Sequence, residues 1–206
     1  MAAVADTLNA DDAVLNLIVP AADLSTVAAS SKRAAAVQEH ELVLGEGPAH
    51  TVLDDQTLIA SSADVMMQRW PRYGGVVSEL GVESVSALAL TTPHSALGSL
   101  VVLNPYDPTP PSHLNQLRRV GAALTQEILT EFEHPDPDLA SSPVLGQTDY
   151  HDEVHQATGM IMAQTGRSAA DALAMLKARA FADGMTIGAL AAKIVSREIR
   201  FDPRTA

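Results

Sequence analysis

The C-terminal fold is decided by the stretch Val154-His-Gln-Ala-Thr-Gly-Met-Ile-Met-Ala-Gln-Thr-Gly-Arg-Ser168. Its apolar residues recur at helical spacing, at Val154, Ala157, Ile161 and Met162. They lie on one side of a helix that we expect over about Tyr150–Gln164. Thr165-Gly166 is a suitable end for it, because glycine adopts the left-handed C-cap conformation without strain.

Two more helical segments follow this stretch. The second opens with Ser168-Ala-Ala-Asp171, a capping-box pattern in which the hydroxyl and the carboxylate can satisfy orphan amide donors, and it stops at Asp183-Gly184. The third begins near Thr186. Their apolar positions are Leu173, Leu176 and Ala180 in the second and Ile187, Leu190, Ile194 and Val195 in the third. Small residues are dense throughout, so this segment predicts a small all-α, three-helix domain over 148–200.

Two proline-rich stretches lie upstream, Asn104–Pro111 and His134–Asp138 with its continuation Ser141-Ser-Pro143. Neither can be interior helix or central strand. Before the first stretch, five runs rich in Val, Leu and Ile predict strands, and two segments predict helices. The runs are Ala13–Val19, Leu24–Ala29, Thr57–Ser61, Ser84–Leu90 and Leu97–Leu103, and the helices Lys32–Glu39 and Trp70–Leu80. This order predicts an α+β domain around an antiparallel sheet.

One long helix is expected between the two proline-rich stretches, over Ser112–Glu133. Its apolar stripe consists of Leu114, Leu117, Val120, Leu124, Ile128 and Phe132. Such a stripe must be buried. Either it packs on its own sheet, or its C-terminal half extends into a dimer seam.

Composition excludes several classes of protein. The chain has no cysteine, so it has no disulfide, thiolate metal site or thiol nucleophile. The N-terminus lacks a basic signal-peptide region, and no run approaches the ~18 apolar residues of a membrane helix. We therefore expect a cytoplasmic protein. No G-x-S-x-G elbow, P-loop or dinucleotide fingerprint occurs, which argues against an enzyme and against a bound cofactor.

The net charge of −12 is unevenly distributed. Residues 1–147 contain 18 Asp and Glu against 6 Lys and Arg, whereas residues 148–206 contain 7 of each kind. The acidic excess, which would oppose binding to a polyanion, therefore belongs to the first part alone.

The three C-terminal helices resemble the ANTAR family of RNA-binding domains. The first-helix motif of that family usually has an apolar residue, then Gln-Ala-Lys-Gly, Ile-Leu-Met and, after a small gap, Gly. The stretch from Val154 to Gly166 follows it. The second-helix and third-helix cores of the family are matched by Ala172, Leu176, Ala180, Ile187, Leu190-Ala191 and Ile194-Val195.

The first part is similar to the GAF domains that often precede ANTAR domains. The matching segments are Leu44-Gly-Glu-Gly-Pro48, Arg69-Trp-Pro71, Gly81-Val82 with Ser84-Val85, and Leu97-Gly98 with Leu100. The resemblance implies a GAF-like sensor domain over 11–133 and a Pro/Ser-rich linker over 134–147. The first helix of a GAF domain must be short or missing before Asp11. Ala49 stands where many relatives have Cys, which removes a thiol-based redox sensor.

The resemblance implies that a dimer binds paired RNA hairpins with short loops in a nascent transcript, so that a competing terminator hairpin cannot form. The motif positions implicated are Ala157, Thr158, Gly159, Met162 and Gln164. Thr158 replaces the lysine of the family, Gln164 stands where a basic residue is common, and Met185 and Thr186 occupy positions that are often basic. We expect Thr158 to be exposed, so that Thr158→Lys would restore the cation.

Cations elsewhere are expected to compensate. Lys193, Arg197, Arg200 and Arg204 recur at steps that put them on one face of the third helix if it extends that far, and Lys177 lies on the second. We expect phosphate contacts from Lys177, Lys193 and Arg197. The alternative is an ordinary solvated face.

Other constellations are weaker. His151 and His155 are four residues apart on one helix, but no third ligand is evident, so we expect no metal site. Glu46 has no partner base or nucleophile, and a structural role in a glycine-rich turn is favoured. We expect Trp70 to be a core anchor or a pocket wall at the start of a helix.

The sequence therefore predicts a homodimeric, signal-responsive transcription antiterminator that binds RNA and senses an unknown small molecule or protein. The alternative is a ligand-sensing or protein-interaction module whose ANTAR-like segment has lost RNA binding.

Overall fold

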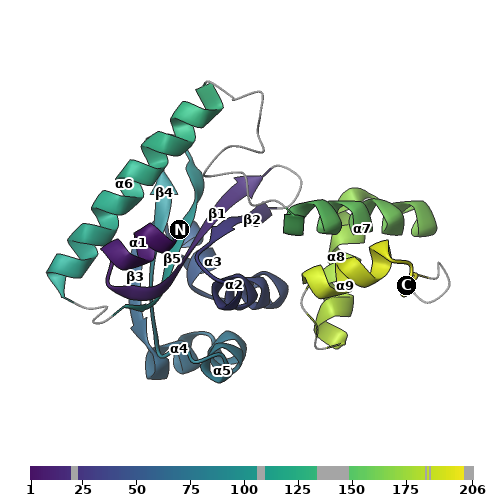
Figure 1. Cartoon of the computed structure of the whole chain (residues 1–206), viewed down its shortest axis with the longest axis horizontal. Coiled ribbons are helices and arrows are strands. Elements are labelled where there is room, and N and C mark those ends of the chain that lie inside the picture. The colour runs from purple at the N-terminus through teal and green to yellow at the C-terminus, as the bar shows by residue number, and fades with distance from the viewer. Residues whose placement is uncertain (20–22, 106–109, 134–148, 184, 186, 202–206) are drawn as a thin grey trace. The chain divides into compact units, whose positions relative to one another are not determined.

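The computed structural model describes residues 1–19, 23–105, 110–133, 149–183, 185 and 187–201 (Figure 1). They form two compact units, one built from the elements α1 to α6 and one from α7 to α9. No helix among these described residues is long and apolar enough to cross a membrane. The predicted linker, 134–147, lies outside them.

A five-stranded sheet forms the centre of the first unit, in the order β2-β1-β5-β4-β3. The pairs β1–β5, β5–β4 and β4–β3 are antiparallel, and Val101 of β5 lies opposite Val14 of β1 and Ala87 of β4. The strands are β1 (Ala10–Val19), β2 (Asp23–Ala29), β3 (Leu58–Ser62), β4 (Ser84–Thr91) and β5 (Ala96–Pro105). The predicted α+β class and all five predicted strands are confirmed.

One face of the sheet is covered by α6 (Pro111–Glu133), with the short helix α1 (Ala2–Thr7) nearby (Figure 1). The buried cluster on this face joins Leu100 and Val102 of β5 to Leu117 and Ile128 of α6. A Cβ atom on Gly121 would lie 2.3 Å from Leu88 Cδ2, which shows how closely the helix backbone approaches the sheet. The helix predicted over Ser112–Glu133 is confirmed. Four residues of its stripe, Leu117, Val120, Leu124 and Ile128, pack in the cluster on its own sheet, and the side chain of Phe132 lies outside the described residues. The dimer seam stays a prediction.

The opposite face is packed by α3 (Pro48–Asp55), with α2 (Lys32–Leu44), α4 (Ala63–Arg69) and α5 (Pro71–Glu79) completing this side. Trp70 lies between α4 and α5, at the predicted start of the second of these helices. Its side chain is only 4% exposed, and its Nε1 donates to Thr51 Oγ1 at 3.0 Å. This confirms Trp70 as a core anchor. The sequence did not predict α3 and α4, because helices of eight and seven residues contain too few turns for a periodic signal.

The turn between α2 and α3 shows why Glu46 needs no catalytic role. Gly45 ends α2 at a φ of 65°, and Pro48 opens α3. The Glu46 carboxylate accepts the backbone N–H groups of Arg72 at 2.8 Å and Tyr73 at 3.1 Å, and so caps α5. Burial raises the pKa of Glu46, but hydrogen bonds from these two residues outweigh it and hold the pKa below its usual value. The structural interpretation is confirmed.

The second unit consists of α7 (Asp149–Thr165), α8 (Ala169–Ala182) and α9 (Ile187–Val195). Ser168 Oγ accepts the Asp171 amide at 3.2 Å and donates to the Asp171 carboxylate at 2.7 Å, so the predicted cap forms. The hydrophobic core formed by the described residues has small and aliphatic side chains, which allows α7 to pack on both other helices. It consists of Ala157, Ile161, Ala172, Leu176, Ala180, Ile187, Leu190, Ala191 and Ile194.

Candidate nucleic-acid interface

The motif residues of α7 divide between the core and the surface. Ala157 is fully buried, and Thr158 is only 9% exposed, with its hydroxyl donating to the Val154 carbonyl at 2.7 Å. The expectation that Thr158 is exposed is therefore wrong. It lies one turn before the buried Ile161 on the side of α7 that packs on the other helices. A lysine introduced there would disturb packing, so Thr158→Lys does not test RNA contact cleanly.

Gly159 and Met162 lie on the surface of α7. Met162 is 36% exposed. Gly159 is exposed, and a Cβ atom built on it would meet nothing within 4 Å. A glycine inside a helix is less stable than alanine by about 1 kcal/mol, and nothing in the described part of this unit requires it. A close approach by another molecule is a physical reason for a glycine at this position.

The end of α9 differs from the sequence-based expectation. The helix ends at Val195, and Arg197 has a φ of 65°, in the left-handed region. The Glu198 amide donates to the Lys193 carbonyl at 2.9 Å, which closes the helix end in the manner of a Schellman motif. Lys193 and Arg197 therefore do not share a continuous helical face with Arg200, and this prediction is wrong. Arg204 lies outside the described residues.

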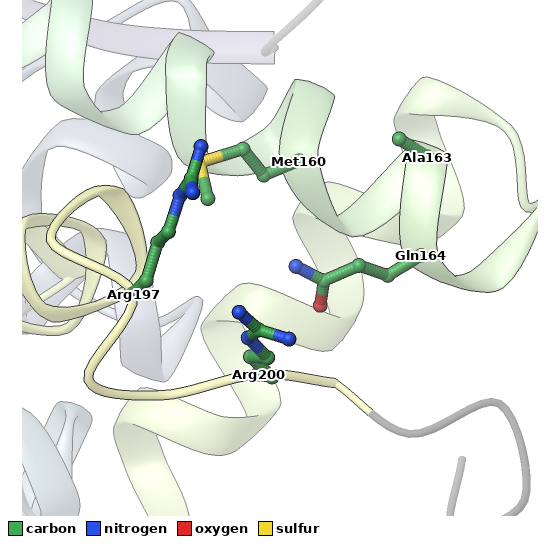
Figure 2. A pocket seen from close by; sticks show the side chains of 5 residues that line it. All are labelled: Met160, Ala163, Gln164, Arg197 and Arg200. Atoms are coloured by element: carbon green, nitrogen blue, oxygen red, sulfur yellow. The ribbon is translucent and has the colours of Figure 1, made fainter.

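A shallow pocket of about 270 Å³ lies between the C-terminal half of α7 and the segment that follows α9 (Figure 2). Its lining comprises Met160, Ala163, Gln164, Arg197 and Arg200. Figure 2 shows the side chains of Gln164 and the two arginines extending toward the same space from opposite sides. The structure thus brings together two predicted residues, Gln164 and Arg197.

Three pocket residues were not predicted as sites. Met160 and Ala163 precede Gln164 by four and one positions, so the helical spacing was a signal that could have found them. Arg200 was recognised only as part of the supposed helical stripe. Of the other predicted residues, Lys193 is exposed on α9 and Lys177 is half-buried on α8, and neither lines the pocket.

The pocket can supply hydrogen-bond donors and positive charge. Gln164 Oε1 accepts the backbone N–H of Phe201 at 2.8 Å, and its amide NH₂ group has no hydrogen-bond acceptor among the residues that the structure describes. Asp183, at the end of α8, pairs with Arg179 at 2.6 Å. Within the part of the chain that the structure describes, Arg197 and Arg200 have no carboxylate partner. The arrangement therefore suits an anionic ligand.

Metal binding finds no support at the histidine pair. His155 is exposed on α7, while the side chain of His151 lies outside the described residues. The described residues contain no group of three or more His, Cys, Asp or Glu side chains that could hold a metal ion.

The family of the second unit follows from its sequence, because residues 147–195 match the ANTAR domain family. The C-terminal unit is an ANTAR domain. The match extends over all three helices, α7 to α9, and includes the motif positions from Ala157 to Gln164. A comparison with curated proteins finds no match.

Solved structures resemble the sheet-containing part of the chain. A domain of a two-component sensor histidine kinase from Sinorhizobium meliloti has 18% identity and a TM-score of 0.51, over 64% of this chain and 88% of that one. A GAF domain from an Acinetobacter phosphoenolpyruvate-protein phosphotransferase has 14% identity and a TM-score of 0.45, over 66% and 81%. A GAF domain of a Bacillus halodurans sensor histidine kinase has 13% identity and a TM-score of 0.46, over 64% and 94%.

The first unit therefore has a GAF-like fold, and it precedes an ANTAR domain in the same chain. The helix α1, which precedes β1, is six residues long.

Proposed function

We propose that this protein is a signal-responsive transcription antiterminator that binds paired hairpins of nascent transcripts through its ANTAR domain. The observation that carries the proposal is the three-helix ANTAR match, joined in one chain to a GAF-like fold. Arg197 and Arg200, which have no carboxylate partner among the described residues, support it, because a hairpin loop presents phosphates and unstacked bases to a protein. Such a role places the protein in the cytoplasm.

The proposed RNA-binding surface includes the exposed part of the α7 motif and the cations around it. Gly159 permits close approach, Met162 offers apolar contact, and Gln164 offers an amide donor. Lys177, Lys193 and Arg197 would contact phosphates. Ala157 and Thr158 act from the interior, where they set the packing of α7.

The regulatory part of the proposal assigns sensing to residues 11–133, a linker to 134–147 and RNA binding to 148–200. The GAF-like domain would bind a small molecule or a protein signal. We further propose a homodimer, formed through α6 or the segment that joins it to Tyr150, because two hairpins suit two copies of one recognition surface. A strict monomer in sedimentation experiments, with and without RNA, would contradict this.

A filter-binding titration with a two-hairpin RNA tests the central claim. Affinity should decrease as salt rises, because binding releases counterions from the phosphates. Lys193→Ala combined with Arg197→Ala should weaken binding and lower the salt slope by about one to two units. RNA that is not retained above background even at low salt would favour the alternative, an interaction module without RNA binding. The observation behind that alternative is the loss of cations at Thr158, Gln164, Met185 and Thr186, positions that are often basic in the family.

A further inference from the structure

The segment after α9 is held against α7 by one specific contact. The Phe201 backbone N–H donates to Gln164 Oε1 at 2.8 Å, across 37 residues of sequence. Gln164 is half-buried, and the segment it holds contains Arg200 and, at its start, Arg197. Both arginine side chains line the pocket that Gln164 also lines (Figure 2). The contact therefore fixes two cations beside the C-terminal half of α7.

The conformation of Arg197 adds a second, independent observation. A φ of 65° favours glycine at this helix end, and an arginine there is conformationally unfavourable. Its guanidinium group has no carboxylate partner in the described chain, and its side chain lines the pocket along one edge, with the guanidinium group beside Met160 (Figure 2). The chain thus keeps a strained arginine whose charge is not used within the described fold.

We propose that residues 197–201 form a replacement cationic element in which Arg197 and Arg200 bind the phosphate backbone of the RNA, while Gln164 is the positioning residue that holds the element on α7. This inference rests on the proposed function for the identity of the ligand. It deepens that function by assigning Arg200 as a contact and by giving Gln164 a role as acceptor. The charge missing from α7 at Gln164 is thereby supplied from the neighbouring chain segment.

Two simpler explanations predict different behaviour. Solvated surface arginines would leave RNA affinity unchanged when removed. Arginines that merely complement the C-terminal end of the α7 dipole would contribute to stability and not to RNA affinity. The pocket geometry favours a ligand, because guanidinium groups and the Gln164 amide donors face one space.

The experiment measures RNA affinity and its salt slope for the full chain and four variants. Arg197→Ala/Arg200→Ala should lower affinity for two-hairpin RNA about 100-fold, roughly tenfold per arginine, and lower the slope by about two units. Gln164→Met keeps side-chain length and helix propensity but removes the acceptor, and should lower affinity about tenfold. In the double-arginine background, where no cation is left to position, Gln164→Met should have a clearly smaller effect, limited to the loss of the amide donor. Gln164→Lys in that background should restore about tenfold in affinity and one unit of slope.

Inorganic polyphosphate serves as a second probe, because it presents phosphates without bases or hairpins. If the wild type binds RNA and the double-arginine variant binds equally well, the element is overturned while the RNA function stands. If the wild type binds polyphosphate through the arginines but not RNA, the phosphate site stands and the RNA function fails. Binding of neither probe overturns both. An equal effect of Gln164→Met in both backgrounds overturns the positioning role, and circular dichroism melts confirm that each variant is folded.

Discussion

Replacing Arg197 with glycine should stabilise the ANTAR unit although it weakens RNA binding. The left-handed φ of 65° is unfavourable for a residue with a Cβ atom by about 1–2 kcal/mol. Glycine relieves this strain, but its greater conformational freedom in the unfolded chain lowers the free energy of unfolding by roughly 0.5–1 kcal/mol. The exposed Arg197 side chain loses little packing. We therefore expect a net gain of about 0.5–1 kcal/mol.

The matched control is Arg200→Gly. Arg200 is not among the residues with positive φ, so glycine there relieves no strain and should be destabilising by roughly 0.5–1 kcal/mol. The two variants remove the same side chain, three residues apart, and differ in the sign of their effect on stability. For a unit of this size, 0.5 kcal/mol corresponds to a shift of roughly 2–4 °C in Tm.

The single tryptophan makes the assay specific for one unit. Trp70 is buried in the GAF-like unit, so its fluorescence follows the unfolding of that unit alone. Far-ultraviolet circular dichroism follows helices of both units, and the transition seen only by circular dichroism reports the ANTAR unit. If Arg197→Gly lowers the Tm of that transition as much as Arg200→Gly does, the strain argument is refuted. RNA affinity should decrease in both variants.

Three more predictions concern single positions. Gly159→Ala should stabilise the ANTAR unit by about 1 kcal/mol in thermal denaturation, because the new Cβ atom meets nothing within 4 Å. If RNA approaches the helix closely at this glycine, the same variant should bind RNA more weakly in a titration. In α5, Gly75→Ala should stabilise the GAF-like unit in the same way, because its Cβ atom also meets nothing within 4 Å. Gly74→Ala places a Cβ atom 3.0 Å from the Met66–Met67 backbone and should destabilise this unit by about 1–3 kcal/mol. Equal urea midpoints for the two variants would contradict the packing argument. Burial raises the pKa of Asp12, but hydrogen bonds from Ser30, Ser31 and Arg33 outweigh burial and hold this pKa below its ordinary value. The stability that this carboxylate contributes is therefore present above the pKa of the unfolded chain and is lost as the pH falls below about 4. Arg33→Gln should make the free energy of unfolding depend less on pH between about pH 2 and 5. Because the Arg33 side chain is 36% exposed, the variant should lower the stability of the GAF-like unit by only about 2 kcal/mol at pH 7. Trp70 fluorescence in urea measures both effects.

Long periodic segments were predictable from the sequence, and short or context-dependent ones were not. The strand runs and α6 have enough alternating or helical positions to define a face, and the Ser168 cap has a local mechanism that needs no tertiary information. The short helices α3 and α4 lack such a signal. The end of α9 was misjudged because the chain places arginine, not glycine, at the left-handed position.

The candidate site was predictable in part. The family motif located the relevant region of α7, and Gln164 and Arg197 do meet at one pocket. The burial of Thr158 could not be read from its own position, because the close packing of α7 on α8 and α9 depends on small residues from three separate helices. The contact between Gln164 and Phe201 joins residues 37 positions apart, and no local pattern indicates it.

The way α6 is attached to the sheet limits how a signal could leave the GAF-like unit. A 23-residue helix is a rod of about 34 Å. It is held near its start, where His113 Nε2 lies 3.1 Å from Ser86 Oγ, at its middle by the close approach of Gly121 to Leu88, and near its end by the buried Ile128. A helix held at three points along its length cannot tilt at one of them alone. Between His113 and Ile128 the helix is therefore expected to follow a change in the sheet as one body.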